Sequence, residues 1–279
     1  MKNRLVILSI LIGTTLGTGI AGSRTWHVEL DGSGDVPDLQ AAMDSAAVGD
    51  TVLVGPGQYE IGPILVASGI VLTSREGPLR TKLVGFPGSL GGLACTNLPQ
   101  PTTISGLWFD RFSDGGSEGL GAINILDCFR ITIRGCMFSN NDRAGVTIAS
   151  QQLVVIENST FADNTVALNI IFGDGTLHHN IFWDPVPAMG VFLVYCNDML
   201  NILDVPAPLR SGNFSLDPQF CSTGDYRVSI GSPCAAGNSP LGGNCNLIGA
   251  LPPPPGYAPP AARGGGFEGR GNLGQIGGV

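Results

Sequence analysis

The amino-acid sequence predicts an all-β chain that winds into a solenoid of stacked coils, and three observations support this fold class. Four similar segments each end in a phenylalanine, at 106–109, 135–138, 158–161 and 179–182. The phenylalanines lie 29, 23 and 21 residues apart. An Asn or Asp turn follows three of them, at 140–141, 163–164 and 184–185. The 279 residues include 42 glycines, and only 13% are charged. Repeats of this length and composition are typical of β-solenoids, in which equivalent residues stack from coil to coil.

Residues 1–23 are predicted to be a secretion signal rather than part of the fold. A basic start with Lys2 and Arg4 precedes an apolar run over residues 5–12, and small residues lead to Ser23. This order is typical of a signal peptide. The apolar run is too short to span a bilayer comfortably, and no later stretch qualifies as a membrane span. We therefore expect a secreted, extracellular or cell-surface protein with no membrane span after signal removal.

Residues 24–60 are predicted to form an N-terminal cap and the first coil. After a strand at 26–30, apolar residues recur with helical spacing at Leu39, Ala42, Met43 and Ala46. Asp35 or Asp38 is expected to cap the start of this short helix, and Gly49 to end it. A helix in this place would cover the open end of the first coil, where unpaired backbone would otherwise be exposed.

Residues 61–212 are predicted to form the parallel coils, because short β-rich segments alternate there with turn residues. About eight coils of about 22 residues, at about 4.8 Å per coil, give a rod of roughly 35–40 Å. Successive coils pair in register, so one interior column is expected from Phe109, Phe138, Phe161 and Phe182. Cys128 and Cys136 flank the segment 131–133 and are candidates for buried interior thiols.

Residues 213–250 are predicted to form a loop-rich C-terminal cap. Residues 251–279 are rich in Pro and Gly and are expected to be a disordered tail or a linker. Seven cysteines in an exported chain predict disulfides with one thiol left over. Cys221, Cys234 and Cys245 crowd the C-terminal end, where a disulfide would tie the cap together.

The charge balance bears on the class of partner. Loss of Lys2 and Arg4 with the signal leaves 12 basic and 22 acidic residues, a net charge of about −10. Nucleic-acid binding needs clustered Lys and Arg, so no nucleic-acid partner is expected. No cysteine pair has the spacing of a zinc site, and the three histidines are not arranged with the cysteines. No structural metal and no cofactor are therefore predicted.

Both ends of the predicted domain carry motifs of a known group. Residues 38–59 match its cap and first coil, and the ending contains DPQFC (217–221), DYRV (225–228), GSPC (231–234) and CNLIGA (245–250). The chain resembles secreted bacterial right-handed parallel β-helix proteins of the pectin-lyase-like superfamily over roughly residues 26–250. This resemblance implies the fold and an association with carbohydrate, with a polysaccharide or a cell-surface glycan as partner. It does not by itself imply catalysis.

An enzyme of this superfamily would need carboxylates gathered on one face. The candidates are Asp110, Asp114, Asp142, Asp163, Asp174 and Asp184. A glycoside hydrolase would use two or three of them as acid and base, whereas a lyase would use them to hold Ca²⁺ beside a basic residue. The arginines of REGPLR (75–80) lie in an early coil and depart from the lyase pattern. Asp also suits tight turns, so only convergence of at least three carboxylates with a basic residue would favour catalysis.

Aromatic residues and one histidine pair are further candidates. Trp108 and Trp183 adjoin interior phenylalanines, so alternation places them outside, where they are candidates for stacking on sugar; Tyr195 and Phe112 are further candidates. Strand alternation is expected to send His178 and His179 to opposite faces. His179 occupies the slot of Asn158 one coil earlier, which favours a turn or stacking role for this histidine.

The sequence thus predicts a polysaccharide-recognising or scaffold protein without a clear catalytic signature. The first alternative is a polysaccharide lyase or glycoside hydrolase that uses Asp110, Asp142, Asp163 or Asp184, with Ca²⁺ needed if it is a lyase. The second alternative is an adhesin or structural surface element that its tail tethers or presents.

Overall fold

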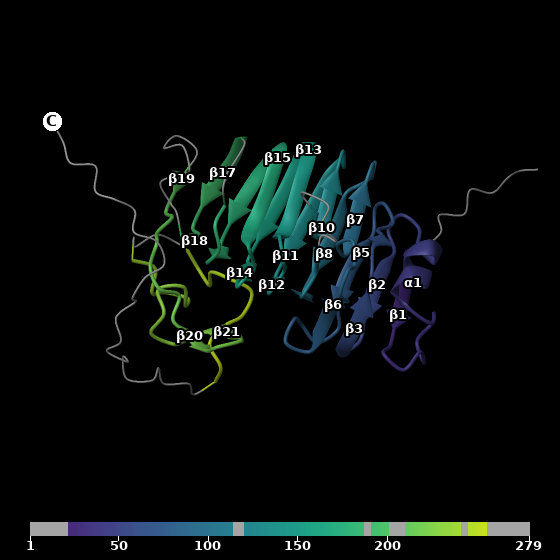
Figure 1. Ribbon diagram of the computed structural model, residues 1–279, viewed down its shortest axis with the longest axis horizontal. Helices are drawn as coiled ribbons and strands as arrows, with labels where there is room; N and C mark the ends of the chain where they lie inside the picture. The colour runs from purple at the N-terminus through teal and green to yellow at the C-terminus, as the bar shows by residue number, and fades with distance from the viewer. Residues whose placement is uncertain (1–21, 114–119, 187–190, 201–209, 241–244, 256–279) are drawn as a thin grey trace, which may run out of the picture.

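In the computed structural model, which describes residues 22–113, 120–186, 191–200, 210–240 and 245–255, the chain coils into a parallel β-helix (Figure 1). Each complete coil places one strand segment on each of three faces, which we name A, B and C in the order in which the chain visits them. Equivalent strands of successive coils pair in parallel. The all-β solenoid predicted from the sequence is confirmed.

Face A is the seven-stranded sheet of the described chain. Its strands, in spatial order, are β3 (Gly57–Ile61), β6 (Thr81–Gly85), β9 (Trp108–Asp110), β12 (Met137–Ser139), β14 (Thr160–Ala162), β16 (Ile181–Phe182) and β18 (Asp198–Met199). Each strand is followed by a turn onto face B, which we name the A–B corner.

Faces B and C are joined into one sheet, because two long strands bend around the corner between them. These strands are β13 (Ala144–Glu157) and β15 (Val166–His178). The remaining strands of face B are β4 (Ile64–Leu65), β7 (Leu93–Thr96) and β10 (Gly121–Leu126). Those of face C are β1 (Thr25–Val28), β2 (Thr51–Val54), β5 (Val71–Ser74), β8 (Thr102–Ser105), β11 (Arg130–Arg134), β17 (Val191–Tyr195) and β19 (Arg210–Ser211).

A single short helix among the described residues, α1 (Leu39–Ser45), lies at the N-terminal end of the rod (Figure 1). The side chain of Asp38 caps it by accepting a hydrogen bond from the amide of Ala41. Leu39, Ala42 and Met43 are buried, as their helical spacing predicts. No helix in the described part of the chain is long and apolar enough to cross a membrane.

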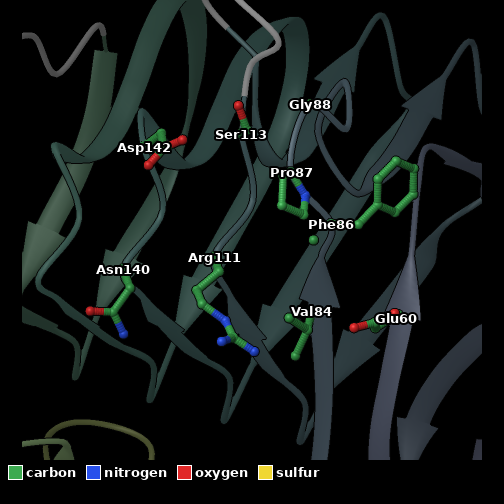
Figure 2. Close-up of a pocket in the computed structure, with 10 residues that line it drawn as sticks. Glu60, Val84, Phe86, Pro87, Gly88, Arg111, Ser113, Asn140 and Asp142 are labelled. Carbon is green, nitrogen blue, oxygen red and sulfur yellow. The ribbon is translucent and has the colours of Figure 1, made fainter.

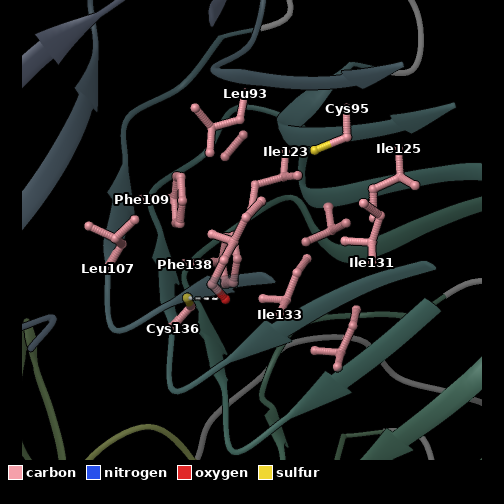
Figure 3. Packing of buried hydrophobic residues seen from close by; sticks show 14 of the residues in the cluster. Leu93, Cys95, Leu107, Phe109, Ile123, Ile125, Ile131, Ile133, Cys136 and Phe138 are labelled. Atoms are coloured by element: carbon pink, nitrogen blue, oxygen red, sulfur yellow. Dashed lines mark hydrogen bonds between the residues drawn. The ribbon is translucent and has the colours of Figure 1, made fainter. Parts of the chain in front are cut away.

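Phenylalanine side chains form the predicted column inside face A. The ring centroids of Phe109 and Phe138 are 5.0 Å apart, those of Phe138 and Phe161 are 4.5 Å apart, and those of Phe161 and Phe182 are 5.0 Å apart. All four rings are buried. Figure 3 shows Phe109 and Phe138 beside leucine, isoleucine and cysteine side chains of the same core. Stacking follows from parallel register, which sets equivalent residues one strand spacing apart.

The corners are turned by residues in the left-handed backbone region. At the A–B corner these are Arg111 (φ 57°), Asn140 (φ 53°) and Asp163 (φ 65°). At the turn from face C to face A, which we name the C–A corner, they include Asn158 (φ 46°) and His179 (φ 58°). Short polar side chains tolerate this conformation better than others, which explains why Asn and Asp recur at these corners, although Arg111 and His179 also adopt it.

Phe214 still pairs with Asp198 on face A, and the C-terminal segment that follows, residues 215–240 and 245–255, lies along the outside of face A rather than only at the tip of the rod (Figure 1). It contains the antiparallel pair β20 (Phe220–Ser222) and β21 (Asp225–Val228). Tyr226 and Leu251 pack on Met137 and Ala162 of the middle coils. This segment therefore buries outward-facing residues that would otherwise contact water.

One disulfide joins this segment to the coils, between Cys196 and Cys245. The prediction of several disulfides with one thiol left over is wrong, because Cys95, Cys128 and Cys136 point into the interior from different coils and Cys234 lies beside Asp198. Cys128 and Cys136 are buried thiols, as expected. A disulfide does tie the C-terminal cap, but its partner Cys196 comes from the coils.

Candidate functional site: a groove at the A–B corner

A groove of about 450 Å³ follows the A–B corner across four neighbouring strands of face A (Figure 2). Glu60 lies on β3, and Val84 and Gly85 lie on β6. The turns after β9 and β12 contribute Arg111, Ser113, Asn140 and Asp142. The loop Phe86, Pro87 and Gly88 forms one wall. The groove thus presents one cation, carboxylates, an amide and an aromatic ring to a ligand.

Local backbone geometry sets these side chains in place. Arg111 and Asn140 occupy the same position in successive coils, because the residues just before them, Asp110 and Ser139, are paired across β9 and β12. Their left-handed conformation ends the strand and directs the next residues toward face B. Gly85 lies against the same turn, and a Cβ there would stand 2.6 Å from the carbonyl oxygen of Arg111. Glycine is therefore required for the close approach of these coils.

Asp110 organises the polar floor beside the groove. Its carboxylate is buried and accepts hydrogen bonds from Ser139 Oγ (2.8 Å) and Asn140 Nδ2 (2.8 Å). Lys82 Nζ and Arg111 Nε each lie 3.4 Å from Oδ2. A buried carboxylate with this many hydrogen-bond and ion-pair partners is held in one position. Asp110 therefore fixes the orientation of Arg111 and Asn140 rather than facing the groove itself.

The other candidate carboxylates are dispersed over the described chain. Asp142 lines the groove, whereas Asp163 accepts a hydrogen bond from the Tyr226 hydroxyl (2.8 Å) and Asp174 lies on face C. Asp184 is buried and accepts a hydrogen bond from Asn164 Nδ2 (2.6 Å). Burial raises the pKa of Asp184 to about 6. Asp114 falls outside the described residues. Among the described residues, no three of these carboxylates converge in one groove.

Trp108 and Trp183 lie three strands apart on face A, and both are only partly buried. Lys82 Nζ lies 3.4 Å from the centre of the Trp108 ring, and Tyr226 meets this ring edge-on at 5.9 Å. Trp183 packs against the buried residues beneath the C-terminal segment. Both indole rings are thus in contact with the chain itself, and neither lines the groove.

Of the two remaining aromatic candidates, Phe112 lies in the core and Tyr195 lies partly exposed. Phe112 was expected at the surface, but its ring is buried, because the turn after Arg111 brings it back into the core. Tyr195 is partly exposed and stacks on His178. The prediction that His178 and His179 point to opposite faces is wrong. Strand alternation ends at His179, whose left-handed backbone turns its ring back beside that of His178.

Sequence reasoning did not identify Glu60, Phe86, Ser113 or Asn140 as groove residues. The one local signal is the turn at 85–88, where Gly, Pro and Gly surround an exposed phenylalanine. The arrangement can form hydrogen bonds and one ion pair with a ligand and offers an aromatic ring for stacking. The residues that the structure describes contain no group of three or more side chains suited to hold a metal ion.

A family model described as a right-handed β-helix region matches residues 103–201, from β8 to just beyond β18. This match contains Arg111, Asn140 and Asp142 of the groove. No curated protein matches the chain. Over these coils the chain is similar to right-handed β-helix proteins, and together with the parallel sheets wound around one axis this match establishes an all-β, right-handed parallel β-helix.

Proposed function

We propose that this chain is an exported β-helix protein of the pectin-lyase-like kind that binds polysaccharide along the groove at the A–B corner, without catalysis. The observation that carries the proposal is the repetition of exposed polar side chains at one corner of neighbouring coils. Coils are about 4.8 Å apart, a spacing comparable to the length of one sugar ring. Successive sugar units of a glycan chain would therefore meet successive coils.

The side chains suit a carbohydrate in chemical terms. The hydroxyl groups of sugars both donate and accept hydrogen bonds, and the groove offers the donor Arg111, the acceptors Glu60 and Asp142, and the mixed amide of Asn140. The Phe86 ring is 45% exposed and supplies an apolar face for the C–H side of a sugar. An open groove with mixed polar and apolar lining and one aromatic ring suits recognition better than an enclosed reaction site.

Dispersal of the carboxylates argues for binding over hydrolysis or lysis. A hydrolase needs an acid and a base facing one bond, and a calcium-dependent lyase needs clustered carboxylates. Glu60 and Asp142 both line the groove, but they come from β3 and from the turn after β12, three strand spacings or about 14 Å apart. Asp110 is engaged by Lys82 and Arg111, and Asp163 by Tyr226. The adhesin or scaffold alternative uses the same surface to hold a glycan.

The test is a glycan array followed by affinity measurements on any glycan retained. Arg111→Ala is expected to weaken binding by about tenfold or more, because a charge-assisted hydrogen bond contributes about 1.5–3 kcal/mol. Phe86→Ala is expected to weaken binding by a similar factor, because it removes the apolar ring face that contacts the sugar. Matched controls are Arg130→Ala and Phe129→Ala, which remove exposed side chains of the same types from β11 and the turn before it. These two variants are expected to bind normally.

Three outcomes would overturn the proposal. Unchanged affinity in both groove variants, with loss in Trp108→Ala or Trp183→Ala, would move the site to the tryptophans predicted from the sequence. An activity assay with and without Ca²⁺ tests for catalysis. If the protein releases reducing or unsaturated ends from a polysaccharide and Asp142→Asn abolishes this release, the protein is an enzyme. Absence of any retained glycan would leave the groove without this function.

A further inference from the structure

Two adjacent histidines at the C–A corner bring their Nδ1 atoms to within 2.9 Å of each other. His178 is the last residue of β15, and His179 follows in the left-handed conformation with φ 58°. Because of this turn, the two rings lie at 83° to each other on the same side of the sheet. The site lies at a different corner from the groove and does not depend on the proposed function.

Neighbouring side chains hold the His178 ring in a fixed orientation. Its Nε2 lies 3.1 Å from Oε2 of Glu157, which is the equivalent residue of the preceding coil. Its ring stacks on Tyr195 of the following coil, with centroids 4.9 Å apart and planes inclined by 1°. Arg134 Nε stands 3.9 Å from Glu157 and completes a column of charged and aromatic residues. The Nδ1 atom of His178 is therefore aimed at His179.

The protonation pattern follows from these contacts. Glu157 is an acceptor, so Nε2 of His178 carries the proton and Nδ1 of His178 presents a lone pair. His179 must then carry a proton on Nδ1 and donate it to His178. An Nδ1 that accepts a hydrogen bond carries no proton, so the His178 ring is neutral in this arrangement. A neutral imidazole is the form that ligates metal ions.

The spacing of the two nitrogens matches a chelate. Two imidazole nitrogens about 2.0–2.1 Å from one ion stand about 2.9 Å apart when the angle at the ion is about 90°, and about 3.3 Å apart when it is tetrahedral. A right angle is the preference of Cu²⁺ in tetragonal sites. The geometry points to a bidentate site in which His178 and His179 bind a Cu²⁺ ion through their two Nδ1 atoms.

Binding would require one proton to move and the two rings to turn, because each lone pair now lies near the line between the nitrogens and must point about 45° off this line to meet one ion at a right angle. The ion replaces the shared proton between the rings, and that proton shifts from Nδ1 to Nε2 of His179, so both ligands stay neutral. Glu157 keeps its hydrogen bond to His178 and orients this ligand, as carboxylates commonly do for metal-bound histidines. Water fills the remaining positions of the ion.

The test is a titration of the purified full chain with Cu²⁺, followed by calorimetry and electron paramagnetic resonance. We expect one equivalent to bind, with hyperfine coupling to two nitrogens, and Zn²⁺ to bind more weakly. His178→Gln and His179→Asn are each expected to weaken binding at least about tenfold, because each removes one of two ligands. Asn suits position 179, since Asn158 adopts the same backbone conformation one coil earlier. Glu157→Gln is expected to weaken binding about 10–100-fold.

The remaining histidine provides the matched control. His27 is paired with Asp35 near the N-terminus, and His27→Gln is expected to leave the two-nitrogen signal and the affinity unchanged. Circular dichroism and thermal melting establish that each variant is folded. The proposal fails if the signal persists in a folded variant that carries both His178→Gln and His179→Asn. It also fails if the wild type binds no more Cu²⁺ than that variant.

Discussion

Buried asparagines connect the coils at the C–A corner one residue at a time. Each carboxamide oxygen of Asn180, Asn197 and Asn213 accepts a hydrogen bond from a backbone amide of the preceding coil. Each Nδ2 donates a hydrogen bond to a backbone carbonyl near the end of the face C strand in the preceding coil. Asn180, for example, donates to the carbonyl of Ile156 in β13. These side chains thus satisfy backbone groups that the turn removes from the sheet.

Replacement of Asn180 by Leu is expected to lower the free energy of unfolding by about 2–4 kcal/mol. The amide of Ser159 would lose its acceptor and the Ile156 carbonyl its donor, and each unsatisfied buried group costs about 1–3 kcal/mol. Urea unfolding measures the change. Asn246→Ala, at an exposed position, is the control. Equal stability of the two variants would contradict the role assigned to Asn180.

At the residue scale, regular repetition was predictable and local exceptions were not. The phenylalanine column follows from spacing, because register alone sets each ring on the next. The histidine pair was misplaced because alternation assumes an extended backbone, which His179 does not have. The partner of Cys245 was likewise hidden, since Cys196 lies 49 residues away and is brought close only by coiling.

The C-terminal segment is the element whose position the sequence did not indicate. Its motifs predicted a cap, but its contacts run along face A from Ile181 to Met137. Asn158 donates to the carbonyl of Leu247, and the amide of Ala250 donates to Thr160 Oγ1. Such long-range contacts depend on which outward positions happen to be apolar, and alternation along short strands does not reveal this.

Disruption of the disulfide by Cys245→Ser is expected to destabilise the protein by about 2–4 kcal/mol. The bond closes a loop with a sequence separation of 49, and a covalent link of this kind restricts the unfolded chain. Urea unfolding with and without reductant measures the effect. Reductant is expected to destabilise the wild type to a similar extent and to leave the variant unchanged. A wild type indifferent to reductant would contradict this account.

For the whole molecule, two buried carboxyl groups link stability to pH. Burial raises the pKa of Asp184 to about 6 and that of Asp198 to about 7. Both groups have pKa values of about 3.9 when unfolded, so the folded state holds these protons more tightly. Their stabilising effect is complete below about pH 4 and is lost as the pH rises through the folded pKa values. In the opposite direction, hydrogen bonds from the amides of Ala47 and Arg24 lower the pKa of Asp50, which favours the fold above about pH 4.

Asp184 and Asp198 are therefore expected to lower the melting temperature as the pH rises from about 5 to about 8, whereas His178 and His179, whose pKa values burial lowers, act in the opposite direction up to about pH 6.5. Asp198→Asn is expected to flatten this dependence, because the amide keeps an acceptor for the backbone of Leu216 and does not ionise. Thermal melting at several pH values provides the measurement. Asp142→Asn, at the exposed groove, serves as the control and should follow the wild type. Equal pH dependence of the melting temperature in the wild type and Asp198→Asn would refute the assignment.

The candidate groove was less predictable than the fold. Asn140 was visible in the sequence as a turn residue, whereas Arg111 was not, and their joint position depends on parallel register and on the left-handed turns. Glu60 and Phe86 come from earlier coils and carry no motif. A site assembled across coils from ordinary surface residues leaves little trace in the sequence, because each residue also has an adequate structural role.

Near the end of the described chain, Leu251 lies beside the middle of the rod, where it is buried against Met137 of β12 and Ala162 of β14. A tether that continued from this point to a cell wall or a partner domain would attach at the flank of the molecule. The long axis would then lie parallel to the anchoring surface, and faces B and C would look outward to the medium.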